Sequence, residues 1–398
     1  MSNSKAKLKY PIGLLSLSEF SLSGYGSSHY LNNGQFVWLA SPNIIYNGAF
    51  VGSASSNGLA GNYVNGSGGV RPSVSLKPNT YFSSGDGSFT KPFVIGDTVE
   101  EPSGKSFDTV FAQNNTDIFD EKGIRYEGAN PNNYICLDNK INGACSDSSL
   151  LFRIIGLFDE DTSTDGTNSS GSKKLLKVID TNNYGGASGK YWNSAGTNNW
   201  STASLKTELN ETYLTTLLET SNVNSKLSNG IVNAKWHLGG ASDSNYQTLT
   251  AEGIYTQERN ASAIYSGNPS SIYAKVGLIY PSDYGYATVG GTTKNKSSCR
   301  AKELYNWYDS SYSDCKNNDW LFTSQSSFVN NGEWLLSPYS SLSSRAALLH
   351  SSGSVLLLGN VIVDYSQFAV RPTFYLDSSV LKIVGTGDGS SSNPYRVG

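Results

Sequence analysis

Residues with the chemistry of catalysis are few in this chain and lie far apart. The three histidines, His29, His237 and His350, stand in no motif with a nucleophile. No Gly-x-Ser-x-Gly elbow occurs, although a spatial Ser-His-Asp arrangement leaves no fixed trace in a sequence. We therefore expect a chain without catalytic residues.

Two short stretches approach the patterns of ion-binding loops, and both fall short. Residues 185–190 resemble the end of a phosphate loop, but Tyr184 stands where Gly-x-x-x-x-Gly-Lys needs its first glycine. Residues 159–166 alternate oxygen ligands before a glycine as calcium loops do, yet the twelfth position is Ser172 where a bidentate Glu is needed. We expect hairpin turns at both, no metal and no cofactor; calcium in 159–166 is the alternative left open.

The four cysteines fall into two local pairs, Cys136 with Cys145 and Cys299 with Cys315. Zinc sites favour closer Cys-x-x-Cys spacing or histidine partners, which these pairs lack. Among the three connectivities that four cysteines allow, we expect the two local disulfides. Disulfides indicate an oxidising environment, so we expect an extracellular or cell-surface protein.

Composition excludes several partners. The 398 residues include 29 basic and 32 acidic side chains without a Lys/Arg cluster, which argues against nucleic acid. The longest apolar runs are far shorter than the roughly 20 residues that span a bilayer, so no membrane span is expected. The start lacks the apolar core of a signal peptide. The expected partner is an extracellular protein or a glycan, with a second copy of the chain left open.

The end of the chain repeats its beginning. Trp-Leu-Leu-Ser-Pro from Trp334 answers Trp-Leu-Ala-Ser-Pro from Trp38, and Val-Arg-Pro around Arg371 answers Val-Arg-Pro around Arg71. A Gly-Asp-Gly-Ser tail closes both copies. Such self-similarity predicts a partial internal duplication in which the first copy matches only the second half of a module.

Three regions follow from this repeat. We expect a half-copy β-rich domain over 1–98 that matches 271–398, a linker with a leading loop over 99–130, and a complete domain over 131–398. Leu205, Leu209 and Tyr213 recur at helical spacing after Ser201, a plausible N-cap. With weaker helical signals over 213–227 and 299–308, the expected class is α+β: irregular antiparallel sheets with two or three short helices.

These segments resemble a known family. Tyr-Ile-Cys at 134–136, Phe-Arg-Ile-Ile-Gly at 152–156, Lys-Val-Gly-Leu-Ile-Tyr-Pro-Ser-Asp-Tyr-Gly at 275–285 and the two Val-Arg-Pro runs are similar to repeat modules of exported proteins from gut Firmicutes. Those modules resemble the C-type lectin-like fold of formylglycine-generating enzymes and phage receptor-binding proteins. The resemblance implies a non-catalytic scaffold that presents a ligand surface. The calcium-lectin motifs Glu-Pro-Asn and Trp-Asn-Asp are missing from the sequence, which puts calcium-mediated sugar binding in doubt.

In such folds the last strands carry the binding face. Here the two copies differ in sequence between the anchor residues that they share. Tyr, Ser and Asn suit contact surfaces because they combine area with adaptable hydrogen bonds. Ordinary drift of exposed loops is the alternative explanation of the divergence. The candidate ligand-binding residues are Tyr339, Ser341, Arg345, His350, Asp364, Tyr365 and Gln367.

The repeated anchors Trp38, Arg71, Trp334 and Arg371 are expected to be structural, because a guanidinium can satisfy carbonyls where strands cross. The leading hypothesis is a non-enzymatic extracellular binding or adhesion protein. A structural subunit of a surface filament or layer, a phage receptor-binding protein and, least favoured, an enzyme of the formylglycine-generating type are the alternatives.

Overall fold

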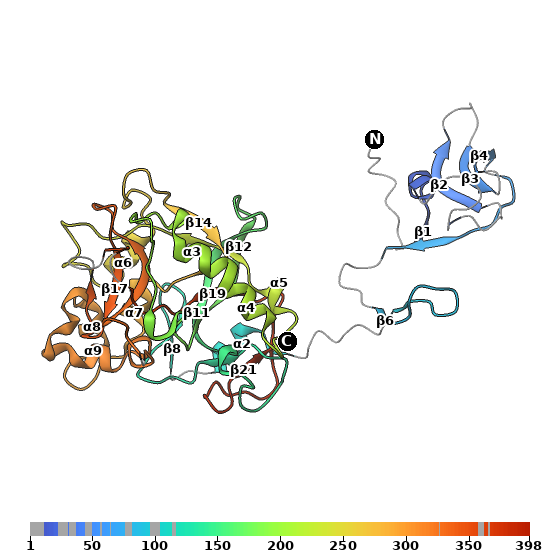
Figure 1. The fold of residues 1–398 in the computed structure, drawn as a ribbon. Helices are drawn as coiled ribbons and strands as arrows, with labels where there is room; N and C mark the ends of the chain where they lie inside the picture. Colours follow the sequence, from blue (N-terminus) through green and yellow to red (C-terminus); the bar gives the residue numbers. More distant parts are fainter. Residues whose placement is uncertain are drawn as a thin grey trace. The chain divides into compact units, whose positions relative to one another are not determined.

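The chain folds into two compact units. The computed structural model describes residues 12–22, 31, 37–43, 50–55, 58–63, 65–75, 82–95, 104–113, 117–325, 327–356, 362–364 and 367–398. They divide into Met1–Glu100, here called unit 1, and Glu101–Gly398, called unit 2. Both units are drawn in Figure 1, and each is described by itself.

Unit 2 is built on an 11-stranded sheet whose main path runs β15-β19-β12-β11-β10-β21-β20, with β8, β9, β13 and β14 attached to it. Its pairs are antiparallel except for the parallel pair β10–β21. The strands are β8 (Ile118–Asp120), β9 (Ile124–Tyr126), β10 (Tyr134–Cys136), β11 (Leu151–Ser163), β12 (Gly171–Asp180), β13 (Asn233–His237), β14 (Ser271–Ala274), β15 (Val276–Gly277), β19 (Thr373–Asp377), β20 (Ile383–Val384) and β21 (Tyr395–Val397).

A second, three-stranded sheet and short helices complete unit 2. The sheet has the order β16 (Gly332–Pro338), β17 (Ala346–His350), β18 (Val355–Leu356). In Figure 1 it lies with α6 to α9 on one side of the unit, while α2 to α5 lie on the other. The helices are α2 (Phe107–Gln113), α3 (Ser204–Glu208), α4 (Leu214–Glu219), α5 (Leu227–Gly230), α6 (Ala251–Glu258), α7 (Pro281–Tyr286), α8 (Lys296–Ala301), α9 (Ser313–Asn317) and α10 (Trp320–Thr323).

The α+β class is confirmed, with irregular antiparallel and mixed sheets. The helices among the described residues are short, but they are more numerous than the two or three expected. Several of them are single turns of four to six residues within loops. The expected helix after Trp200 runs through α3, a π-helical turn at Leu209–Tyr213 and α4, and it buries the predicted stripe of Leu205, Leu209 and Tyr213. Its opening turn is capped by Asn199 and not by Ser201. No helix in the described part of the chain is long and apolar enough to cross a membrane.

The segment 99–130 was expected to be a linker and leading loop, and this expectation needs correction. α2, β8 and β9 all fall within it. β9 pairs with β11 through Gly156 opposite Arg125, so the segment adds strands to the main sheet. These elements are hard to recognise in the sequence because both strands are only three residues long, and β8 lies at the edge of the sheet.

Both expected disulfides are confirmed. Cys136 bonds to Cys145, and Cys299 bonds to Cys315, which leaves none of the four cysteines free. The first joins β10 to the turn before β11, and the second joins α8 to α9. Each closes a short loop, a constraint worth about 2–4 kcal/mol in favourable cases.

The described residues of unit 1 form strands, the helix α1 and a small core. Its elements are β1 (Ile12–Leu14), α1 (Leu17–Leu22), β2 (Val37–Asn43), β3 (Phe50–Ser55), β4 (Gly58–Tyr63), β5 (Pro72–Val74), β6 (Phe82–Ser84) and β7 (Val94–Ile95). β1 pairs with β5, β2-β3-β4 form one sheet, and β6 pairs with β7. The described core consists of Phe20, Val37 and Leu39, with Leu15 and Leu31 against it.

Segments that match in sequence make the same backbone pairs in the two units. Helix α1 occupies the positions that match α7, and β1–β5 pairs in the register of β15–β19. The matched pairs are Ile12↔Val74 with Val276↔Phe374, and Gly13↔Ser73 with Gly277↔Thr373.

The tryptophan anchors also have the same backbone role. The Trp38 amide donates to the carbonyl of Gly69 at 3.0 Å, and the Trp334 amide donates to that of Ala369 at 2.9 Å. In each unit the strand carrying the tryptophan shifts register before the following Ser-Pro. The sequence repeat therefore corresponds to repeated local geometry.

Arg371 is buried where β16, α10 and the start of β19 meet. Its Nε and Nη2 donate to the two carboxylate oxygens of Glu333 at 2.8 and 2.9 Å. Nη2 also donates to the carbonyl of Leu321 at 2.7 Å, and Nη1 to the hydroxyl of Ser324 at 2.9 Å. The bidentate ion pair and these extra acceptors offset the free energy that burial of the charged guanidinium costs.

The other three anchors are buried to different extents. Trp334 is fully buried, and its Nε1 donates to the carbonyl of Lys190 at 2.8 Å. Trp38 and Arg71 are half-buried, and Arg71 donates to the carbonyl of Leu31. These contacts join main chain to side chain, as a structural role requires.

Replacing Glu333 by Ala is expected to destabilise unit 2 by about 3–5 kcal/mol, because Arg371 keeps its buried charge without a carboxylate. Urea unfolding followed by tryptophan fluorescence measures this change. The double variant Glu333→Leu with Arg371→Met is the control, since it removes both charges and is expected to recover most of the loss. A single variant within about 1 kcal/mol of the parent chain contradicts the anchoring role.

Candidate ligand-binding site

The structure corrects one predicted ligand residue. Tyr339 is fully buried, so its ring is closed to a ligand. Its hydroxyl donates to the carboxylate of Asp243 at 2.9 Å, and its amide donates to the carbonyl of Arg345. Because the tyrosine follows Ser-Pro at the end of β16, it turns into the core and fixes the loop behind it.

Five other predicted residues fall in the described part of the chain, in or next to the loops that follow β16, β17 and β18. Ser341 is exposed and also bonds Asp243; Arg345 is half-buried, and Asp364 is exposed beside Gly196. The other two, His350 and Gln367, are half-buried on either side of 330–332, and burial lowers the pKa of His350. Tyr365 lies outside the described residues. Since Ala346 to Leu349 are all buried, β17 offers its face to no ligand.

Residues 159–166 form the turn end of the β11–β12 hairpin. Asp165 accepts the amides of Thr167 at 2.8 Å and Asn168 at 2.7 Å, so its carboxylate closes the turn. These hydrogen bonds, those from Asn168 first, hold the pKa of Asp165 well below its usual range. The alternating oxygens thus act as acceptors within the loop.

Residues 185–190 turn, but they do not form a strand-to-strand hairpin. Gly186–Ser188 make one 3₁₀ turn in a loop that follows β12. The amide of Lys190 donates to the carbonyl of Phe368 at 2.9 Å, and its ammonium pairs with Glu208. The lysine is therefore held by a carboxylate of the same unit.

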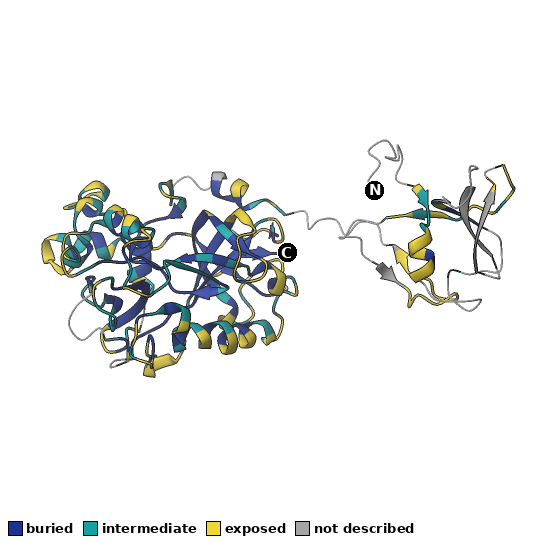
Figure 2. Ribbon diagram, turned by 90° about the horizontal axis from the view of Figure 1, so that it is seen from above, coloured by how far each residue is buried: buried dark blue, intermediate teal, exposed yellow. Residues whose placement is uncertain are grey.

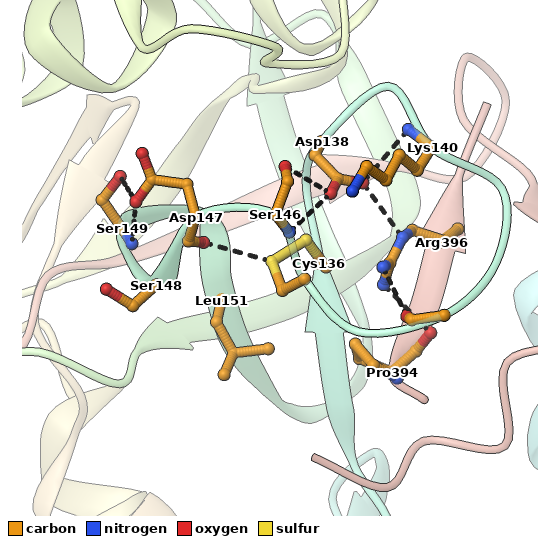
Figure 3. Close-up of a disulfide and its surroundings, with 12 residues drawn as sticks. Cys136, Asp138, Lys140, Ser146, Asp147, Ser148, Ser149, Leu151, Pro394 and Arg396 are labelled. Atoms are coloured by element: carbon orange, nitrogen blue, oxygen red, sulfur yellow. Dashed lines mark hydrogen bonds and ion pairs between the residues drawn. A yellow bond between two sulfur atoms is a disulfide. The ribbon is translucent and has the colours of Figure 1, made fainter. Parts of the chain in front are cut away.

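Among the described residues, one group has the spacing of metal ligands: Cys136, Asp138 and Cys145. Figure 3 shows why it is a structural cluster: the two sulfurs are bonded to each other, and Asp138 faces Arg396. The Asp138 carboxylate lies 3.0 Å from Arg396 Nε and accepts the Ser146 hydroxyl at 2.8 Å. With its ligand atoms occupied in this way, the group does not suit a metal ion.

A pocket of about 240 Å³ opens at the end of β12, beside the loop that this disulfide supports. Its floor is buried and consists of Asp180, Tyr213 and Leu217, while the half-buried Tyr184 flanks it. Exposed hydroxyls and an amide stand on its rim: Ser148, Ser149, Asn182 and Thr216. The arrangement combines hydrogen-bonding groups with an aromatic and an aliphatic surface.

Three different elements bring these side chains together. Asp147 caps a 3₁₀ turn that presents Ser148 and Ser149, and this turn follows the disulfide loop directly (Figure 3). The amide group of Asn182 donates to the Ser148 carbonyl at 3.0 Å, which ties the end of β12 to that turn. Helix α4 supplies Thr216 to the lining.

Asp180 is the charged group of the pocket. Its carboxylate accepts the Tyr213 hydroxyl at 2.8 Å and the Asn182 amide at 2.8 Å. Burial is the main cause that raises the pKa of Asp180 to about 6. The hydrogen bonds stabilise the carboxylate and lower this pKa, but their effect is smaller. The carboxyl group therefore changes charge within the range of mildly acidic surroundings.

Sequence reasoning missed this pocket. Asn-Asn-Tyr-Gly at 182–185 follows a strand, which indicates a polar loop, but nothing in the sequence places it against 148–149 or α4.

Comparison with protein-family models, with curated proteins and with solved structures finds no match to the chain. The site is therefore argued from its geometry alone.

The raised pKa of Asp180 predicts a pH-dependent stability. The folded chain binds this proton more tightly than the unfolded chain, whose carboxyl has the ordinary value of 3.8, so stability present at acidic pH is lost as pH rises through about 6. Relative to Asp180→Asn, the parent chain is expected to lose roughly 2–3 kcal/mol between pH 4 and 7.

Urea unfolding of both chains at several pH values measures this difference, and groups shared by the two chains cancel. The exposed Asp165→Asn serves as the matched control: the pKa of its carboxylate is lowered, so its contribution to stability changes only below about pH 4, and its difference from the parent chain is expected to stay nearly constant between pH 4 and 7. A difference between the parent chain and Asp180→Asn that stays constant over this pH range contradicts the prediction.

Proposed function

We propose that the chain is a non-enzymatic extracellular binding or adhesion protein, and that the Asp180 pocket receives a sugar residue of a glycan. The observation that carries the proposal is the composition of the pocket: hydroxyl, amide and carboxyl groups around a tyrosine and a leucine. Sugars present alternating hydroxyls above an apolar ring face, and such a lining complements both.

Size and charge narrow the ligand class. Ligand pockets for larger organic molecules have volumes of about 300–1,000 Å³, so a cavity of about 240 Å³ suits a single ring at the end or branch of a chain. The described lining residues include no lysine or arginine, and Asp180 adds negative charge. A neutral sugar is favoured over a phosphate or sulfate ester.

The surroundings of the pocket support an extracellular setting. A disulfide supports the turn that carries Ser148 and Ser149, and such bonds persist in oxidising compartments. A C-type lectin-like scaffold belongs to this proposal: the supporting features are the α+β class, two disulfides and two sheets of irregular antiparallel strands.

Binding of the labelled full chain to a glycan array tests the function. We expect selective binding to neutral glycans, and Thr216→Trp is expected to weaken the affinity for the best glycan by at least about tenfold, because an indole at this exposed position fills the cavity. Thr216→Ser is the matched control and is expected to bind like the parent chain.

Ser341→Ala separates the pocket from the face predicted by sequence. If Ser341→Ala abolishes binding while Thr216→Trp leaves it unchanged, the ligand binds at the loop near Asp243 and the pocket assignment is wrong. An array on which the full chain binds nothing removes the functional proposal itself.

A further inference from the structure

A lysine and an aspartate meet in the core of unit 2, whose central strands have the buried colour in Figure 2. Lys177 lies in the buried half of β12, and Asp283 lies in the first turn of α7. The Nζ of Lys177 is 2.6 Å from Oδ2 of Asp283, and the two side chains are only 1% and 2% exposed. Since 106 residues separate them in the sequence, the contact ties a strand to a distant helix.

Aromatic rings lie around the lysine nitrogen. The distances from Nζ to the ring centroids are 4.4 Å for Tyr280, 5.4 Å for both Trp236 and Tyr375, and 6.0 Å for Phe158. Among the described residues, Nζ donates a hydrogen bond to Asp283 alone, although an ammonium carries three donors. Burial lowers the pKa of Lys177, which favours the neutral amine, the nucleophilic form.

The carboxylate of Asp283 is held at both oxygens. Oδ2 accepts the amide of Tyr280 at 3.0 Å as well as Lys177, and Oδ1 accepts Nη1 of Arg125 at 2.9 Å. Burial raises the pKa of Asp283, but the charges of Lys177 and Arg125 outweigh burial and lower it to about 2. The resting form is therefore the ion pair. A proton shift along the hydrogen bond from Nζ to Oδ2 converts this pair into a neutral amine and a carboxylic acid.

We propose that Lys177 and Asp283 join in an isopeptide bond, which the folded chain forms by itself. The neutral Nζ attacks the carboxyl carbon, and Arg125 donates to the negative charge that develops on Oδ1. Oδ2 then leaves as water with two protons of the original ammonium. The new N–C bond replaces the bond from carbon to Oδ2, so the reaction needs no oxidant, reductant or other reactant.

The geometry suits this attack. With Oδ2 at 2.6 Å, the carboxyl carbon beside it lies within about 4 Å of Nζ, close to the separation of about 3–3.5 Å from which a nucleophile attacks. Burial keeps bulk water from the new amide, so hydrolysis does not compete. The reaction occurs once in each chain, and a small population of the neutral pair is therefore sufficient.

Condensation also removes two buried charges, whose desolvation costs several kcal/mol per ion. Arg125 keeps its surroundings after the reaction. It donates to the carbonyls of Glu121 and Lys122 at 3.2 and 3.3 Å, and the amide oxygen replaces Oδ1 as its third acceptor. The rings of Phe158 and Tyr286 lie 4.6 and 5.0 Å from its guanidinium carbon.

The bond would fix the first half of unit 2 to its second half, because β12 precedes and α7 follows residue 271, where the segment that matches unit 1 begins. Unlike the two disulfides, this link survives reduction. It is a single modification of the chain by itself and not turnover of a substrate. It therefore goes beyond the proposed glycan binding and does not depend on it.

Mass spectrometry of the reduced and denatured full chain tests the proposal. We expect the parent chain to be lighter than its sequence by the mass of one water. Proteolytic digestion is expected to yield a branched peptide that contains both Lys177 and Asp283. Fragmentation of this peptide places the bond, which matters because an Asp-Gly pair such as Asp165-Gly166 loses the same mass when it forms a cyclic imide.

Three variants accompany the parent chain. Lys177→Met and Lys177→Arg are expected to have the mass of their sequences, and the arginine keeps the buried positive charge in case the methionine variant fails to fold. Lys173→Met is the matched control. Lys173 lies on the same strand, 2.8 Å from Asp377, but its side chain is 47% exposed, so this variant is expected to lose one water as the parent chain does.

The proposal is overturned if the parent chain has the full mass of its sequence and Lys177 appears only in linear peptides, because the pair is then a permanent ion pair. A loss of water that persists in Lys177→Arg also overturns it, since another group is then responsible. Neither outcome affects the glycan-array test of the Asp180 pocket.

Discussion

Pairing of β12 with β19 is the interaction on which unit 2 depends. It joins a strand from the first half of the unit to one from the second half, in antiparallel register from Leu175↔Asp377 to Ile179↔Thr373. Residues 175–180 of β12 and all of β19 are buried on both faces of the sheet, so neither strand can stand at an edge without exposing core side chains. The Arg371 anchor next to β19 and the Trp334 contact with Lys190 follow from this junction.

The same junction creates the candidate ligand site. β12 ends at Asp180, whose amide donates to the carbonyl of Pro372 at 2.9 Å, so the last residue of the strand is fixed by the second half. The pocket then forms where this strand end meets the disulfide-supported turn and α4. Unit 1 matches the second half in sequence, and its described residues repeat the backbone contacts of the anchors.

Sequence alone predicted the features that depend on local patterns. Helical spacing identified Leu205, Leu209 and Tyr213, short loop spacing identified both disulfides, and repetition identified the matched strands of the two units. Features set by distant contacts were missed. Tyr339 resembles a surface tyrosine in sequence, and only its position behind Asp243 buries it.

The strands in 117–126 were missed for a related reason, since strands of three residues carry too little pattern to recognise. The pocket depends on the convergence of 148–149, Asp180 and Thr216 from separate elements, which no spacing in the chain encodes. Sequence thus located the repeat but left open whether the matched residues are equally buried in the two units. The exposed fractions of Val74 and Phe374 answer that question.

Hydrogen exchange of the full chain alone, followed by mass spectrometry, tests the central claim most directly. It compares the matched strand pairs: β1 with β5, and β15 with β19. If the second half of a module needs the first half, amides at 12–14 and 73–74 exchange at least about a hundredfold faster than those at 276–277 and 373–377. Equal protection in the two units contradicts the account, because the matched strands of unit 1 then hold as firmly as those of unit 2 without the β12 pairing.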